Sequence, residues 1–284
     1  MIFISTGGYY ERSAYESARE LIANGFFNIE LSGGQFSESL HQDLLKLKGQ
    51  ACLQIHNYFP PPRVPFVFNL GSLNIETADA AMQHARKAIT WAADFSQPVY
   101  SFHAGFLLDP APKELGRRIG KRELFDRETS LEKFISRVNE LAEFSRDLGV
   151  ELLVENNVLS HSNYKEFGEN PLLMVTPDEA VRIMESTLSN VNMLVDVAHL
   201  KVSARTLGFD PISMFTKCQK WIHAYHLSDN DGLSDSNQEV REDSWFWEHL
   251  QRDLKYYSLE IYKTDLDHMK RQFALTQKKL GLIE

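Results

Sequence analysis

The feature that most constrains this chain is an alternation of short apolar runs with longer amphipathic segments from one end to the other. The apolar runs lie at residues 2–5, 28–31, 51–56, 99–103, 150–155, 192–196, 222–226 and 257–262. Helical segments are expected between them, among others at about 12–24, 76–95, 130–148 and 265–280, and one that opens at Thr176-Pro177. Buried strands rich in Val, Ile and Leu that alternate with helices predict a parallel sheet covered by helices.

A (β/α)8 barrel fits this alternation better than a doubly wound open sheet. Eight units in 284 residues leave roughly 35 residues for each unit, which suits a βα unit. No Gly-x-Gly-x-x-Gly turn follows the first apolar run, and no Gly/Ser-rich or Pro-rich linker divides the sequence. We therefore predict an α/β protein with one TIM-barrel domain over residues 1–284.

The composition indicates which class of ligand and which cellular compartment to expect. The formal net charge is −9 and no basic run interrupts it, whereas a nucleic-acid-binding protein usually shows a basic footprint. Cys52 and Cys218 are the only cysteines, too few for a disulfide framework. No basic leader opens the chain, and no apolar stretch approaches the ~18 residues of a membrane span. We expect a cytoplasmic protein that binds a small molecule, not nucleic acid or a membrane.

Polar side chains stand at or near the ends of seven predicted strands: Glu30, His56, His103, Glu155, Asp196, His226 and Glu260. From Glu155 to Asp196, to His226 and to Glu260 the intervals are 41, 30 and 34 residues, each about one βα unit. Adjacent strands would bring these four side chains together at the barrel mouth. Three carboxylates and one imidazole suit Mn²⁺ or Mg²⁺ and tolerate Co²⁺ or Zn²⁺. From spacing alone, buried carboxylates paired with Lys or Arg are the alternative.

Three segments carry a family resemblance: Gly149-Val-Glu-Leu-Leu-Val-Glu-Asn, Leu194-Val-Asp-Val-Ala-His and His226-Leu-Ser-Asp-Asn-Asp-Gly. In order and spacing they resemble the xylose-isomerase-like barrel superfamily, which contains sugar-phosphate isomerases and epimerases, inosose dehydratases and three-zinc apurinic endonucleases. The resemblance implies one divalent metal ion, Mn²⁺ first, held by Glu155, Asp196, His226 and Glu260. It also implies substrate contacts by His56, His103, His199 and Asp229.

The sequence departs from this family after the Asp-Asn-Asp-Gly turn. Relatives often have Asp-x-His there, whereas this chain has Asp235-Ser-Asn237. Asn237 replaces a histidine that the three-metal enzymes need, which argues against the endonuclease activity. The polar, acidic segment 234–243 would instead lie beside the metal.

The activity that the resemblance implies is a metal-dependent isomerase or epimerase acting on a sugar or sugar phosphate. Glu155 and Glu260 would be base and acid in a proton transfer through an enediolate, with His199 steadying the oxyanion. An inosose-type dehydratase would use the same site, and an endonuclease-like phosphodiesterase or a non-catalytic sugar-binding barrel are further alternatives.

Three finer expectations remain. Lys201, Arg205 and Lys263 follow strand ends and are candidates to meet a substrate phosphate. Analogy with relatives favours a homodimer. The histidines at positions 41, 84, 161, 249 and 268 are expected at the surface.

Overall fold

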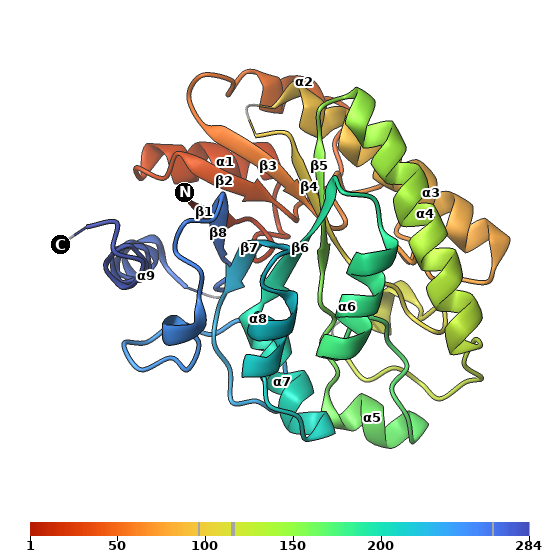
Figure 1. Cartoon of the computed structure of the whole chain (residues 1–284). Helices are drawn as coiled ribbons and strands as arrows, with labels where there is room; N and C mark the ends of the chain where they lie inside the picture. Colours follow the sequence, from red (N-terminus) through yellow and green to blue (C-terminus); the bar gives the residue numbers. More distant parts are fainter. Residues whose placement is uncertain (96, 115–116, 263, 284) are drawn as a thin grey trace.

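The computed structural model describes residues 1–95, 97–114, 117–262 and 264–283. Within them, eight parallel strands close into a barrel in chain order, because β8 pairs with β1 (Figure 1). The strands are β1 (Ile2–Ser5), β2 (Asn28–Leu31), β3 (Cys52–His56), β4 (Val99–His103), β5 (Glu151–Glu155), β6 (Val191–Asp196), β7 (Ile222–Leu227) and β8 (Tyr256–Leu259). The prediction of a (β/α)8 barrel is confirmed.

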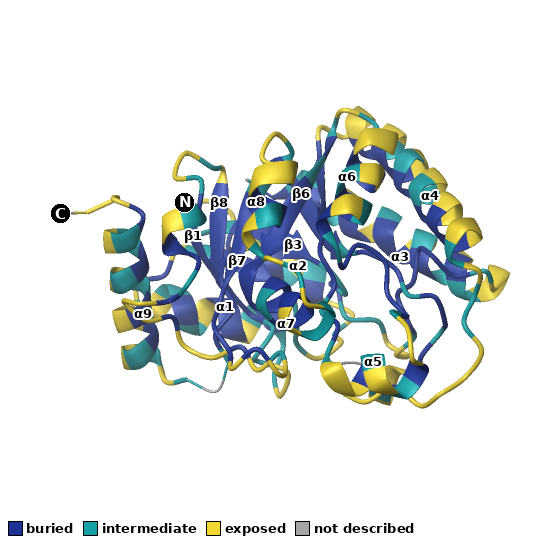
Figure 2. Ribbon diagram, turned by 60° about the horizontal axis from the view of Figure 1, so that its bottom comes forward, coloured by how far each residue is buried: buried dark blue, intermediate teal, exposed yellow. Residues whose placement is uncertain are grey.

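Helices surround the strands with their polar faces outward, as Figure 2 shows by the buried strands and the exposed outer helix surfaces. They are α1 (Ala14–Ala23), α2 (Leu40–Leu45), α3 (Ile75–Asp94), α4 (Arg127–Asp147), α5 (His161–Phe167), α6 (Pro177–Ser186), α7 (Val197–Leu207), α8 (Ile212–Cys218) and α9 (Leu266–Lys279), with short 3₁₀ turns η1 (Pro112–Glu114) and η2 (Trp247–His249). The sequence did not predict α5 and α8, because seven residues are too few to show a helical period. Across the described ranges, every helix is too short or too polar to cross a membrane.

The barrel interior is apolar at one end and polar at the other. Its apolar plug is a buried cluster of Phe3, Val99, Leu153, Leu194, Ala224 and Tyr256. Side chains alternate along a strand, so the residue two positions further on shares the same face. On β5, β6 and β7 those residues are Glu155, Asp196 and His226. The strands therefore place these three side chains above the plug, at the C-terminal mouth where barrel enzymes carry their active sites.

Local sequence signals determine where strands end and helices begin around this mouth. Asp196 ends β6 and is also the N-cap of α7, because its Oδ1 accepts a hydrogen bond from the His199 amide at 2.7 Å. Thr176 caps α6 with Pro177 in the first turn, as predicted. The last strand is shorter than predicted and ends at Leu259, so Glu260 lies one residue beyond it.

One histidine expected at the surface is buried. His84 on α3 is 7% exposed and stacks on the Tyr58 ring at 5.2 Å. Burial lowers its pKa to about 4, so the ring is neutral at physiological pH. The amphipathic pattern of α3 gave no reason to place a histidine on its inner face. The reason lies in the β3–α3 loop, whose aromatic side chains cover that position.

Candidate metal centre and adjoining pocket

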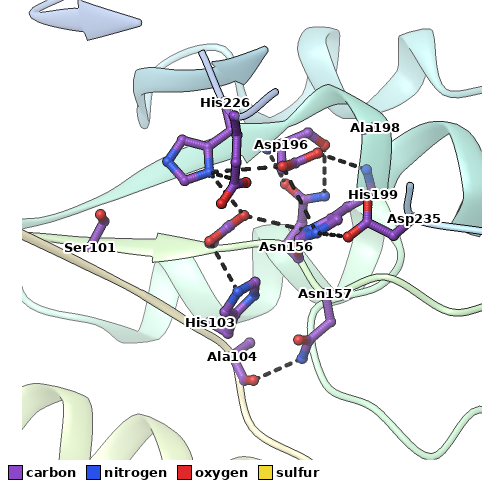
Figure 3. Close-up of polar contacts among 12 residues, drawn as sticks. Ser101, His103, Ala104, Asn156, Asn157, Asp196, Ala198, His199, His226 and Asp235 are labelled. Carbon is purple, nitrogen blue, oxygen red and sulfur yellow. Dashed lines mark hydrogen bonds and ion pairs between the residues drawn. The ribbon is translucent and has the colours of Figure 1, made fainter. Parts of the chain in front are cut away.

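The four side chains predicted to bind a metal meet at the barrel mouth. Glu155, Asp196, His226 and Glu260 each offer one ligand atom, and these atoms lie within 4.8 Å of one another. The first three are fully buried and Glu260 is 6% exposed. Figure 3 shows Asp196 and His226 side by side, with His199 and Asp235 toward one end and His103 toward the other.

The three carboxylates gather around one nitrogen of His226. Its Nδ1 lies 3.1 Å from Glu260 Oε2, 3.5 Å from Glu155 Oε1 and 3.8 Å from Asp196 Oδ2. Each carboxylate comes from a different strand end, so the cluster depends on the register of β5, β6, β7 and β8. In that register, Asp196 pairs with His226 and His226 pairs with Ser258, two residues before Glu260.

Unpartnered buried atoms show that these residues fit a divalent cation. Both carboxylate oxygens of Glu155, Oδ2 of Asp196 and Nδ1 of His226 are buried without a hydrogen-bond partner among the described residues. A buried polar group without a partner costs free energy, and a buried carboxylate costs more than a neutral group. A cation offsets this cost, and three carboxylates with one imidazole form a hard donor set suited to Mn²⁺, Mg²⁺ or a similar ion.

In the metal-free protein, protons take up part of the negative charge. Burial opposes protonation of His226, but the carboxylates of Glu30 and Glu260 outweigh it and hold the imidazole pKa well above its usual range. Burial raises the pKa of Asp196 to about 7, and the charge of Glu155 acts in the same direction. For Glu260 the burial effect is outweighed by His226, and the carboxyl pKa falls to about 2. Binding of a metal ion at this site would therefore release protons.

Glu30 on β2 holds the far side of the His226 ring. Its Oε2 lies 3.0 Å from His226 Nε2 and also accepts a hydrogen bond from Gln54 Nε2 at 3.2 Å. Glu30 is fully buried. A carboxylate that accepts the Nε2 proton leaves Nδ1 as the nitrogen that faces the cluster. The sequence marked Glu30 only as a polar residue in a buried strand, because its contact with His226 spans 196 positions.

Three further histidines surround Glu155. His56 Nε2 lies 3.4 Å and His103 Nε2 3.6 Å from Glu155 Oε2, while His199 Nδ1 lies 3.4 Å from Glu155 Oε1. His56, His103 and Glu155 also have ligand atoms within 4.8 Å of one another. Burial lowers the pKa of His103 to about 4, so this ring is neutral and can bind a cation or accept a proton from a ligand.

His199 is held on both ring nitrogens. Nδ1 lies 3.0 Å from the Asn156 carbonyl oxygen, and Nε2 lies 3.2 Å from Asp235 Oδ2. Burial is outweighed by the carboxylates of Asp196 and Asp235, which hold the His199 pKa well above its usual range. Asp235 is thus a site residue that the sequence noted only as part of a divergent motif.

Asp229 and two of the predicted phosphate-binding side chains make hydrogen bonds within the protein. Asp229 accepts hydrogen bonds from Lys201 Nζ at 2.6 Å, the Asn230 amide at 2.8 Å and the Ser244 hydroxyl at 2.7 Å. Arg205 donates to the Asp231 carbonyl oxygen at 2.7 Å. Lys201 and Arg205 therefore anchor the loop that follows β7. The third candidate, Lys263, lies outside the described residues.

A cavity of about 470 Å³ adjoins the cluster. His103, His199 and Asp235 line it next to the cluster. Aromatic side chains from the loops after β3 and β4 form much of the remaining wall: Tyr58, Phe68 and Phe106. Arg117 and Arg118 also line it. The volume lies in the range typical of small-molecule sites, ~300–1,000 Å³. The loops that follow β3 and β4 thus form part of this pocket.

Comparisons with known proteins agree with this architecture. A crystal structure of a D-tagatose 3-epimerase-like protein superposes with a TM-score of 0.75 at 18% identity, over 99% of this chain and 97% of that one. A D-psicose 3-epimerase crystallised in the presence of D-fructose gives 0.69 at 13% identity, over 99% of both chains. A Thermus thermophilus protein soaked with ZnCl₂ gives 0.66 at 20% identity, over 98% of both chains. At these identities the likeness shows the fold.

No curated protein matches the chain in sequence. The family described as "Xylose isomerase-like TIM barrel" matches residues 19–256, from within α1 to the start of β8. This match covers most of the barrel, including Glu155, Asp196 and His226. The chain therefore belongs to the xylose isomerase-like TIM barrel family.

Proposed function

We propose that this protein is a divalent-metal-dependent isomerase or epimerase of a small sugar or sugar phosphate. The observation that carries the proposal is the cluster of Glu155, Asp196, His226 and Glu260 beside a cavity of sugar-sized dimensions. Buried ligand atoms of the first three have no hydrogen-bond partner among the described residues. Structures of similar fold that are named as sugar epimerases support the reaction class. The presence of Asn237, where the three-metal enzymes need a histidine, argues against a phosphodiesterase.

The four clustered residues would hold the metal ion. The oxygen-rich donor set favours Mn²⁺, with Mg²⁺, Co²⁺ and Zn²⁺ as alternatives. When bound, such an ion acts as a Lewis acid toward a sugar carbonyl and makes the neighbouring C–H more acidic.

Glu155 and Glu260 are the proposed proton carriers. They reach the site from β5 and from the end of β8, so a sugar carbon between them can meet one carboxyl on each face. One carboxylate accepts the proton from the carbon next to the carbonyl. Delivery of a proton to the opposite face of that carbon by the other carboxyl gives an epimer. Delivery of the proton to the former carbonyl carbon, together with transfer of the neighbouring hydroxyl proton to the former carbonyl oxygen, gives an isomer.

The histidines around the cavity are the proposed substrate contacts. His199 carries a proton and lines the cavity, so it can donate a hydrogen bond to a sugar oxygen that gains negative charge. His103 lines the same cavity as a neutral ring, and His56 lies behind it at 5.6 Å between ring centroids. Asp229 is proposed to hold the loop that carries Asp235, since Lys201 and Ser244 occupy its oxygens.

Metal content and proton exchange test the proposal together. Untagged protein is expected to contain about one equivalent of Mn, Co or Zn by elemental mass spectrometry, and Glu155→Gln and His226→Ala are expected to lose it. The loaded protein should exchange a carbon-bound proton of a ketose, a ketose phosphate or an inosose with solvent deuterium, followed by NMR. Loss of water from an inosose instead would indicate the dehydratase. A folded protein that neither contains metal nor gains thermal stability from added divalent ions would refute the catalytic proposal.

A further inference from the structure

Tyr262 is a partly buried aromatic residue that contacts a proposed metal ligand. It lies two residues after Glu260, and its hydroxyl donates a hydrogen bond to Glu260 Oε1. The other oxygen of the same carboxylate, Oε2, lies 3.1 Å from His226 Nδ1. The tyrosine hydroxyl and the His226 ring thus contact different oxygens of one carboxylate. Rotation of the carboxylate would break the tyrosine contact.

The chain makes room for this ring at the far end of the sequence. A Cβ atom added to Gly7 would lie 2.0 Å from the Tyr262 hydroxyl oxygen, and one added to Gly8 would lie 2.9 Å from Tyr262 Cδ1. Neither glycine has a left-handed backbone conformation. The requirement at both positions is therefore space, and the space is filled by the tyrosine ring.

The backbone of Tyr262 is fixed as well. Its amide donates a hydrogen bond to the Asn237 carbonyl oxygen at 3.0 Å. Asn237 lies in the segment where this chain departs from its relatives, and its φ of 43° is unusual for a residue other than glycine. Tyr262 therefore joins the loop after β1, the divergent loop after β7 and the Glu260 carboxylate.

We propose that Tyr262 is a positioning residue that fixes the orientation of Glu260 and so determines which carboxylate oxygen faces the metal. The glycines at 7 and 8 admit the ring, and the Asn237 carbonyl holds its backbone. This inference rests on the proposed function in that Glu260 must be a metal ligand. Groups that orient a ligand in this way change metal affinity or activity by about 10–100-fold when they are removed.

The first test is Tyr262→Phe, which keeps the ring in its place and removes only the hydroxyl. The Co²⁺-loaded variant should show a visible absorption spectrum different from that of the wild type, and its Co²⁺ affinity, measured against a competing chelator, should fall about 10-fold or more. With a sugar that the wild type turns over, kcat should fall while KM changes little. Tyr257→Phe is the matched control, because it removes another tyrosine hydroxyl, which lies 2.6 Å from the Gln251 carbonyl oxygen and does not contact the cluster.

Gly7→Ala provides the second test, since it leaves the tyrosine in the sequence but displaces its hydroxyl. It should produce the same kind of change in the Co²⁺ spectrum. In the Tyr262→Phe protein, Gly7→Ala should change the spectrum less than it does in the wild type. If Tyr262→Phe has the same Co²⁺ spectrum and Co²⁺ affinity as the wild type, the role of Tyr262 is overturned and the proposed function is left intact. A changed spectrum in a protein that turns over no sugar would support Tyr262 and count against the proposed reaction. Failure of the wild type to bind Co²⁺ would overturn both.

Discussion

Asp196→Asn is expected to stabilise the metal-free protein, although it removes a proposed metal ligand. Burial raises the Asp196 pKa from 3.8 to about 7. A carboxyl with a raised pKa in the folded state favours folding fully only below its unfolded pKa, and this contribution is lost as pH rises through the folded pKa. The difference between the unfolded and folded pKa values means that the ionised carboxylate lowers the free energy of unfolding by about 4 kcal/mol at pH 8. Asparagine is neutral at every pH and still caps α7 through its amide oxygen.

Urea denaturation in the presence of a chelator measures this effect. At pH 8 the Asp196→Asn protein should unfold with a free energy up to about 4 kcal/mol above that of the wild type, and the gain should vanish toward pH 4. Asp265→Asn is the control, because it makes the same change at the N-cap of α9, away from the cluster. Metal should remove this difference, since an ion at ~1,000 times its Kd adds about 4 kcal/mol to the wild type alone. A gain that is absent, or equal at pH 4 and pH 8, would refute the reasoning.

Three other changes test separate parts of the structure. Glu30→Gln should weaken metal binding by about 10–100-fold in a chelator competition, because Glu30 orients the His226 ring; unchanged affinity would mean that β2 plays no part in the site. Lowering the pH from 6.5 to about 4 should lower the free energy of unfolding of the wild type by up to about 3 kcal/mol through His84 alone, because His84 binds a proton in the unfolded chain but not in the folded one. In His84→Phe this part of the pH dependence should be absent. Lys201→Ala should lower the free energy of unfolding by about 1–3 kcal/mol through loss of its Asp229 contact, with metal affinity unchanged; a selective rise in KM for phosphorylated sugars would instead restore a role in substrate binding.

The sequence predicted the fold and the four clustered residues because both follow from local periodicity. Strand ends recur once per βα unit, so the spacing of Glu155, Asp196 and His226 was enough to assign them to adjacent strands. Glu260 was predicted within a strand, but the chain leaves β8 after Leu259, and the Tyr262 amide bonds the loop at Asn237.

Contacts between distant segments could not be predicted in the same way. The Glu30–His226 contact spans 196 positions, and the Gly7–Tyr262 contact joins segments near the two ends of the chain. Neither leaves a periodic trace in the sequence. The same limit explains why Lys201 looked like a phosphate contact, since its partner Asp229 comes from a different βα unit.

The direct junction between β6 and α7 would also make one backbone amide a reporter of the proposed metal binding. Asp196 offers Oδ2 to the cluster while Oδ1 accepts from the His199 amide, so one carboxylate belongs both to the ion-binding site and to the first turn of a helix. An ion that immobilises Asp196 also immobilises this turn. The amide proton of His199 should therefore exchange with solvent more slowly in the loaded protein than in the empty one. Hydrogen exchange at a single backbone position would then follow the loading of the site without substrate, chromophore or label.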